Sequence, residues 1–171
     1  MLFMTTEIDS LLPEIYGDLQ QLARFHRSRL CSKKNLGTRS IVHQAYLNLV
    51  KSKASIKNKA QLLYLTSNAM RNIIIDNARA WAAKKRGGKN IDVPLEQVDL
   101  VSAQRSDDLL ALEAALIDLN KQNSRLVKVV TCLFFGGLSQ EETSEALNLS
   151  LSTVKRDWVL AKALLFRKLS S

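Results

Sequence analysis

The sequence lacks any apolar run approaching the roughly 20 residues that a membrane-spanning helix needs. Its first residues also lack the charged-then-apolar order of a signal peptide. The two cysteines, Cys31 and Cys132, lie far apart and fit no metal-ligand spacing. We therefore expect no membrane insertion, no bound metal and a location in the reducing cytoplasm.

The patterns that usually mark an enzyme are also missing. The sequence shows no nucleophile–base set, no cluster of metal ligands and no glycine-rich loop that could cradle a phosphate. We therefore expect neither catalytic residues nor a cofactor.

Negative charge is scarce outside one segment. Residues 1–90 carry 16 Lys and Arg against 5 Asp and Glu, and residues 121–171 carry 8 against 4. Between them, residues 91–120 carry 1 against 7. Two basic blocks flanking an acidic connector favour a polyanionic partner, either nucleic acid or a membrane surface.

Residues 138–169 have the pattern of two short helices joined by a tight turn. Ser139 and Glu142 have the spacing of a capping box at the start of the first helix, which we expect to end near Leu147. The turn follows at 148–150, and Ser150 or Ser152 is expected to cap the second helix.

The second helix has one apolar and one polar face. Val154, Trp158, Ala161 and Leu165 form the apolar stripe at helical spacing. The other side would offer short hydroxyls and cations, as a recognition helix in a DNA major groove does. An ordinary helix pair with a solvated outer face remains the alternative. The expected DNA-facing residues are Ser152, Thr153, Lys155, Arg156 and Val159.

A long helix is expected at about residues 59–85. Leu62, Leu65, Ala69 and Ile73 line its buried side, whereas Asn68, Arg71, Ile75 and Arg79 fall on a different face. The helix runs into cations at 84–86, which suit phosphate contact and also suit a helix C-terminus.

The middle of the chain has weaker helical patterns than its two ends. Residues 91–108, which include Pro94, are expected to be irregular, and a helix is expected at 109–119. Another helix is expected to begin at Gln122 or Ser124, with Leu126, Val129, Val130 and Leu133 packing inward. The glycines Gly136 and Gly137 would end it.

Three segments resemble bacterial sigma-70-family factors of the extracytoplasmic-function (ECF) type. The segment AMRNIIIDNARAWAAKKR (69–86) resembles their promoter-reading segment, and SIVHQAYLNLVKS (40–52) resembles the helix that grips the RNA polymerase clamp. LVKVVTCLFFGGLSQEETSEALNLSLSTVKRDW (126–158) resembles their C-terminal domain. The motifs occur in the family's order and span nearly the whole chain.

The resemblance implies an all-α protein with two helical domains, at 1–90 and 107–171, joined by an acidic linker at 91–106. It further implies binding to core RNA polymerase and to promoter DNA, with the C-terminal domain on the upstream element. The expected polymerase contacts are Val42, His43, Gln44, Leu47 and Asn48. The downstream element and melted strand would meet Ile56, Asn58, Ala60, Gln61, Arg71, Asn72, Arg79, Lys84, Lys85 and Arg86.

The chain departs from the family pattern at two positions. Gln44 stands where members usually have a glutamate, and Ser40 where many have an aspartate. Both changes remove negative charge from the expected polymerase-facing surface. Two matters stay open: whether an anti-sigma protein is a partner, and whether the chain is instead a stand-alone helix-turn-helix regulator that binds operators as a dimer.

Overall fold

The computed structural model describes residues 20, 43–45, 47, 59–86 and 100–170, with side chains in the long helices described for 59–83 and from 106 onward. Helices and short connections make up these residues, and no strand occurs among them. The all-α prediction is confirmed.

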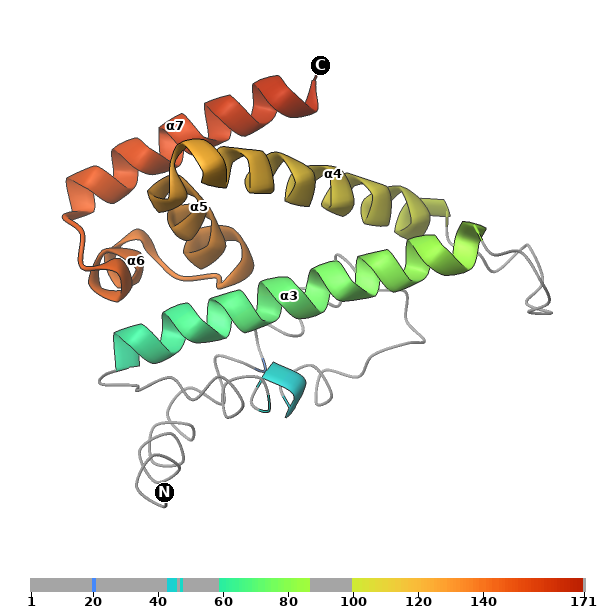
Figure 1. Cartoon of the computed structure of the whole chain (residues 1–171). Coiled ribbons are helices and arrows are strands. Elements are labelled where there is room, and N and C mark those ends of the chain that lie inside the picture. The colour runs from blue at the N-terminus through green and yellow to red at the C-terminus, as the bar shows by residue number, and fades with distance from the viewer. Residues whose placement is uncertain (1–19, 21–42, 46, 48–58, 87–99, 171) are drawn as a thin grey trace.

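Five α-helices and one π-helical turn follow one another in the two long described stretches. Figure 1 shows α3 and α7 on opposite sides, with the other helices between them. Accordingly, α4 and α6 each contact both outer helices, while α5 packs against α7. The elements are α3 (Lys59–Arg86), α4 (Leu100–Gln122), α5 (Ser124–Val130), η2 (Thr131–Phe135), α6 (Gln140–Leu147) and α7 (Leu151–Leu169).

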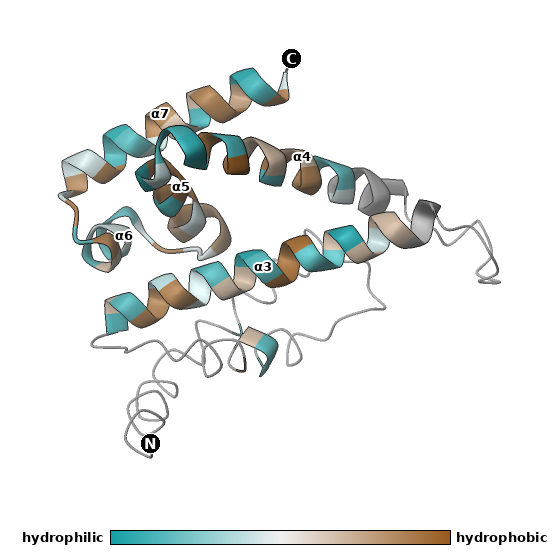
Figure 2. Cartoon of the chain, in the orientation of Figure 1, coloured by the Kyte–Doolittle hydropathy of each residue, from teal (hydrophilic) through white to brown (hydrophobic). Residues whose placement is uncertain are grey.

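One apolar cluster joins α3, α4, α5, η2 and α7. Hydrophobic and hydrophilic residues alternate along α3 and α7, as helices with packed faces require (Figure 2). Burial of these side chains fixes the helices against one another. The cluster comprises Ile74, Ile75, Ala78, Leu109, Ala115, Leu116, Leu119, Leu126, Val127, Val130, Phe135, Ala161 and Leu165.

The long helix α3 has nearly the predicted length but buries more of its surface than predicted. Of the expected inner residues, Leu62, Ala69 and Ile73 are buried and Leu65 is half-buried. Ile75, assigned from the sequence to a different face, is only 2% exposed. The reason is that helices from the C-terminal half cover this second face, a contact that periodicity within α3 cannot reveal.

Helix α4 begins earlier than the sequence suggested. It starts at Leu100, so residues 100–108 are helical, and the prediction of an irregular segment across them is wrong. The acidic residues Asp107 and Asp108 are exposed, while Ser106 and Leu109 are buried. No glycine or proline occurs between residues 95 and 122, so no helix-breaking residue prevents α4 from starting before residue 109. The division at 90 and 107 into two domains remains a prediction.

The chain leaves α5 through a widened turn. Gly136 N–H donates to the Thr131 carbonyl oxygen at 2.8 Å, a bond that spans five residues and defines a π-helical turn. Phe135 is thereby fully buried, whereas Phe134 is 40% exposed. Leu133, expected to pack inward, is only half-buried.

Gly136 is where this turn comes closest to α3. A Cβ at this position would lie 1.9 Å from Ser67 Oγ and 2.6 Å from the Cys132 carbonyl oxygen. No side chain fits such a gap, so the glycine is required by the approach of η2 to α3. Cys132 itself is buried, as expected, and burial raises the pKa of its thiol to about 12.

Candidate nucleic-acid interface

The α6–α7 pair has the predicted helix–turn–helix form. Ser139 Oγ accepts the Glu142 N–H at 3.0 Å, and the Glu142 carboxylate accepts the Ser139 N–H at 2.8 Å, so the capping box is confirmed. Asn148 ends α6 in the left-handed conformation, with φ of 52°. This residue type tolerates that conformation well, and it lets the chain turn sharply into α7.

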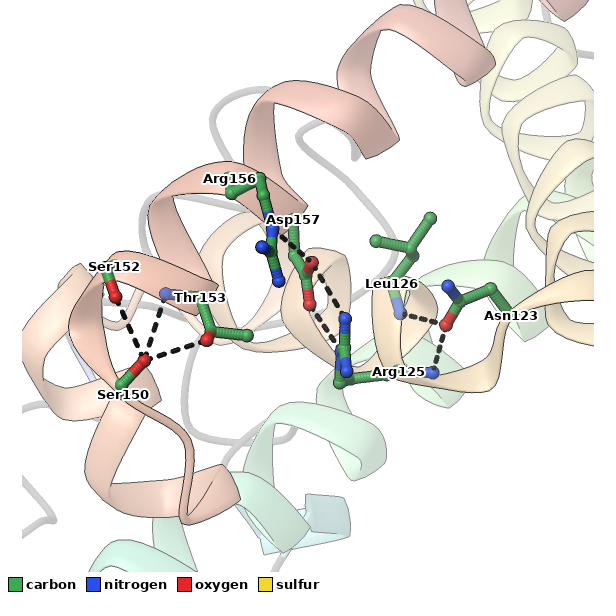
Figure 3. Close-up of polar contacts among 8 residues, drawn as sticks. All are labelled: Asn123, Arg125, Leu126, Ser150, Ser152, Thr153, Arg156 and Asp157. Atoms are coloured by element: carbon green, nitrogen blue, oxygen red, sulfur yellow. Dashed lines mark hydrogen bonds and ion pairs between the residues drawn. The ribbon is translucent and has the colours of Figure 1, made fainter.

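Ser150 caps α7 and organises the hydroxyls at its start. Its Oγ accepts the Thr153 N–H at 3.2 Å and lies 3.1 Å from Ser152 Oγ and 2.8 Å from Thr153 Oγ1 (Figure 3). Three hydroxyls therefore gather where the helix dipole is positive and backbone N–H groups are free of helical partners. Such an end favours an anion such as a phosphate.

The predicted DNA-facing side of α7 points outward. Ser152, Lys155, Arg156 and Val159 are exposed and Thr153 is half-buried. The opposite stripe is also as predicted, since Val154, Ala161 and Leu165 are buried and Trp158 is half-buried. All five predicted residues thus lie on the first turns of one helix, away from the core.

An ion pair between a buried carboxylate and a partly exposed guanidinium lies directly behind this surface. Asp157, only 1% exposed, accepts two hydrogen bonds from Arg125 of α5: one from Nε at 2.6 Å and one from Nη2 at 3.1 Å. These bonds, together with the charge of Asp157, raise the pKa of the Arg125 guanidinium. The pair holds α7 against α5 (Figure 3).

A second ion pair holds the C-terminal end of α7. Lys168 Nζ donates to the Asp118 carboxylate of α4, and Lys121 donates to the same group at 3.1 Å. The hydrogen bond from Lys168 is the main reason that the pKa of Asp118 is lowered, with Lys121 next. Both ends of α7 are therefore attached to the rest of the bundle by charged contacts.

The residues expected to contact the downstream promoter element are more widely spread than those on α7. Ala60 and Gln61 are half-buried near the start of α3, whereas Asn72 and Arg79 are exposed farther along it. Arg79 donates to Asp76 at 3.2 Å, the local ion pair that the sequence spacing allowed. Ile56 and Asn58 lie outside the described residues. Lys84, Lys85 and Arg86 belong to the last turn of α3, but their side chains are not among those described.

Arg71 does not face outward as its predicted role requires. Its Nη2 lies 2.9 Å from Glu113 Oε2, its Nη1 donates to Thr131 Oγ1 at 3.3 Å, and its guanidinium lies 5.8 Å from the Phe135 ring centre. Only 14% of its side chain is exposed. In this structure Arg71 therefore joins α3 to α4 and η2, because C-terminal helices cover its face of α3.

The residues expected to meet polymerase are described in part. His43, Gln44 and Leu47 are exposed, and Ala45 between them is fully buried. Val42 and Asn48 lie outside the described residues. The three described residues therefore share an outward orientation, which leaves them accessible to a partner.

Sequence reasoning missed four residues that shape the site: Glu113, Arg125, Thr131 and Asp157. The burial of Asp157 could have been predicted from its helical spacing. It stands three residues after Val154 and four before Ala161, on the apolar side of α7. A carboxylate in such a position needs a buried partner. Nothing local in the sequence identifies that partner as Arg125.

The arrangement defines an all-α protein with a capped helix–turn–helix pair that presents hydroxyls and cations on its second helix, the form of a DNA-binding unit. Comparison with protein families assigns it further: the profile of the ECF sigma factor family matches residues 5–171. The chain belongs to this family, whose members direct transcription initiation.

The remaining comparisons add no relative. No match was found among curated proteins or among solved structures. Among the helices that the structure describes, none is both long and apolar enough to cross a membrane.

Proposed function

We propose that the chain binds core RNA polymerase and directs it to particular promoters, reading the upstream element with α7. The observation that carries the proposal is the outward set on α7, in which Ser152, Lys155, Arg156 and Val159 are exposed together. Arginine and lysine pair with guanine edges or phosphates, hydroxyls bond either, and an apolar side chain can meet a thymine methyl group. The proposed role requires no catalysis by the chain.

Contact with core polymerase is assigned to the surface of His43, Gln44 and Leu47, together with Val42 and Asn48. Leu47 is 39% exposed and lies beside the exposed His43 and Gln44, so its apolar side chain is accessible to a partner. Gln44 offers a neutral amide where the family usually has a carboxylate, so its contacts would be hydrogen bonds without ionic assistance.

Capture of the melted downstream element is assigned to α3 and the residues just before it. Asn72 and Arg79 are exposed on α3, and Lys84, Lys85 and Arg86 add cations at its end. Rows of cations that contact the sugar–phosphate backbone are typical of proteins that bind single-stranded nucleic acid. Ile56, Asn58, Ala60 and Gln61 would line a base pocket. Arg71 would join them only after leaving Glu113.

Run-off transcription with purified core polymerase tests the proposal. The full chain should co-elute with core polymerase and produce transcripts with defined start sites from a promoter library. Arg156→Ala should lose preference at the base that Arg156 reads, whereas Lys128→Ala, which removes an exposed cation from α5, should not.

Two results would contradict the proposal. One is a chain that never joins core polymerase. The other is a chain that joins it without changing where transcripts begin. A chain that instead forms dimers and protects inverted repeats without polymerase would support the stand-alone regulator.

A further inference from the structure

Two neighbouring residues of α7, Arg156 and Asp157, carry opposite charges and differ sharply in exposure. The side chain of Arg156 is 72% exposed on the proposed reading surface, while the side chain of Asp157 is 2% exposed behind it. Their groups remain close, since Arg156 Nε lies 4.0 Å from Asp157 Oδ1 (Figure 3). At that distance the two groups attract each other but share no hydrogen bond. The buried carboxylate is therefore within reach of a base-reading cation.

Arg125 already occupies this carboxylate. It donates to both oxygen atoms, the two-pronged geometry that a guanidinium makes with a carboxylate. Its own backbone is held in place, because Asn123 Oδ1 accepts the N–H of Arg125 at 3.2 Å and caps α5. Since α5 packs against α7, the guanidinium is delivered to Asp157 from a fixed direction.

We infer that Arg125 is a positioning residue for promoter reading: by engaging both oxygens of Asp157, it leaves Arg156 available to DNA. This inference rests on the proposed function. A buried carboxylate that loses its partner carries a large desolvation cost, and a cation that moves to it would offset that cost. That cation is Arg156, which needs only a side-chain rotation to reach Asp157 and would then leave the reading surface.

Arg125→Ala should therefore resemble Arg156→Ala in its effect on specificity. We expect preference at the base read by Arg156 to fall roughly 5- to 150-fold, the range typical of one specific base contact. Preferences at the other promoter positions should persist. In the double variant R125A/R156A the loss should be no larger than in R156A alone, because both changes remove the same contact.

Asp157→Asn provides the rescue. In the R125A/D157N variant no buried charge remains to draw Arg156 inward, so base preference should return to within a few-fold of wild type, although the melting temperature stays lower. Arg125→Lys keeps the charge but not the two-pronged geometry, and it should retain part of the preference. A purely structural role for Arg125 would instead make the loss of preference follow the loss of thermal stability.

The measurement uses the full chain with core polymerase and a promoter library randomised in the upstream element, with transcripts sequenced. Melting temperatures are recorded for every variant, and Lys128→Ala is the matched control. Absence of promoter-dependent transcripts with the wild-type chain would refute the proposed function. If the wild type and R156A behave as expected, the inference is overturned when R125A keeps its preference or when R125A/D157N fails to regain it.

Discussion

Arg156 and Asp157 illustrate how much single positions decide in this protein. They are adjacent in sequence and opposite in charge, yet one side chain is 72% exposed and the other 2%. The exposed cation is available for recognition, whereas the buried carboxylate attaches α7 to α5. Function and stability are thus divided between successive residues of one helix turn.

Replacing Arg156 by alanine should weaken promoter-specific binding by about 1–3 kcal/mol, the usual value of one base contact. Competition between promoter and unrelated duplex DNA, measured with the polymerase-bound chain, gives this difference. Lys128→Ala is the control for loss of one positive charge. An R156A chain with unchanged sequence preference would remove Arg156 from the reading surface.

Glu113→Ala should destabilise the fold by about 2 kcal/mol, because it leaves the Arg71 guanidinium largely buried without its carboxylate. Thermal unfolding of the purified variant measures the effect, and Glu145→Ala, an exposed acid in α6, is the control. If both variants had the melting temperature of the wild type, the Arg71–Glu113 pair would not contribute to stability.

At the scale of single residues, the sequence predicted the exposed side of α7 better than the buried contacts. Helical spacing alone separates Ser152 and Arg156 from Val154, because all of them belong to one helix. The pairs Arg71–Glu113 and Arg125–Asp157 join residues far apart in the chain. Local periodicity carries no information about such partners.

The bounds of most described helices follow from residues close to each helix end, so the sequence alone predicts them. The capping box of α6, the serine cap of α7 and the extent of α3 all follow from side chains within a few residues of each boundary. Pro94 predicts irregular structure in its own neighbourhood, but it does not prevent α4 from starting six residues later at Leu100. Exposed acids are compatible with a helix whose other face is packed.

Gly136→Ala should test the tightest contact between elements. The added methyl group would collide with Ser67 Oγ and with the Cys132 carbonyl oxygen, so η2 and α3 must separate. We expect a loss of about 1–3 kcal/mol in the free energy of unfolding, typical of overpacking. Chemical denaturation measures this loss. Ser67→Gly in the G136A background should recover part of it, and no coupling between the two changes would contradict the proposed contact.

Across the whole molecule, positive charge is concentrated in two basic blocks, and the first contains Lys84, Lys85 and Arg86 near its end. If these residues contact phosphates, neutralising them should reduce the dependence of DNA binding on salt more than it changes sequence preference. The slope of log affinity against log salt should fall by about 2 for three lost contacts to a single strand. Titrations at several salt concentrations with the polymerase-bound triple alanine variant would show this, and an unchanged slope would refute it.

How the helices pack against one another was the feature that the sequence predicted least well. The order of helices and their all-α class follow from the sequence, but the burial of Ile75 and Arg71 depends on α4 and η2 lying along α3. A helix with apolar residues on more than one side can pack in several ways. The choice is made by surfaces that fold elsewhere in the chain.

The π-helical turn at Thr131–Phe135 has a consequence for how this protein could vary. A turn of this kind holds one residue more than an α-helical turn, so the angular positions of residues before and after it are out of phase. That offset explains why Phe135, rather than Leu133, completes the core. Deleting one residue there would restore the α-helical hydrogen bonds and leave Phe135 in its place beside Arg71. Deleting a residue earlier in α5 would instead rotate the residues after it by about 100° and turn that ring away.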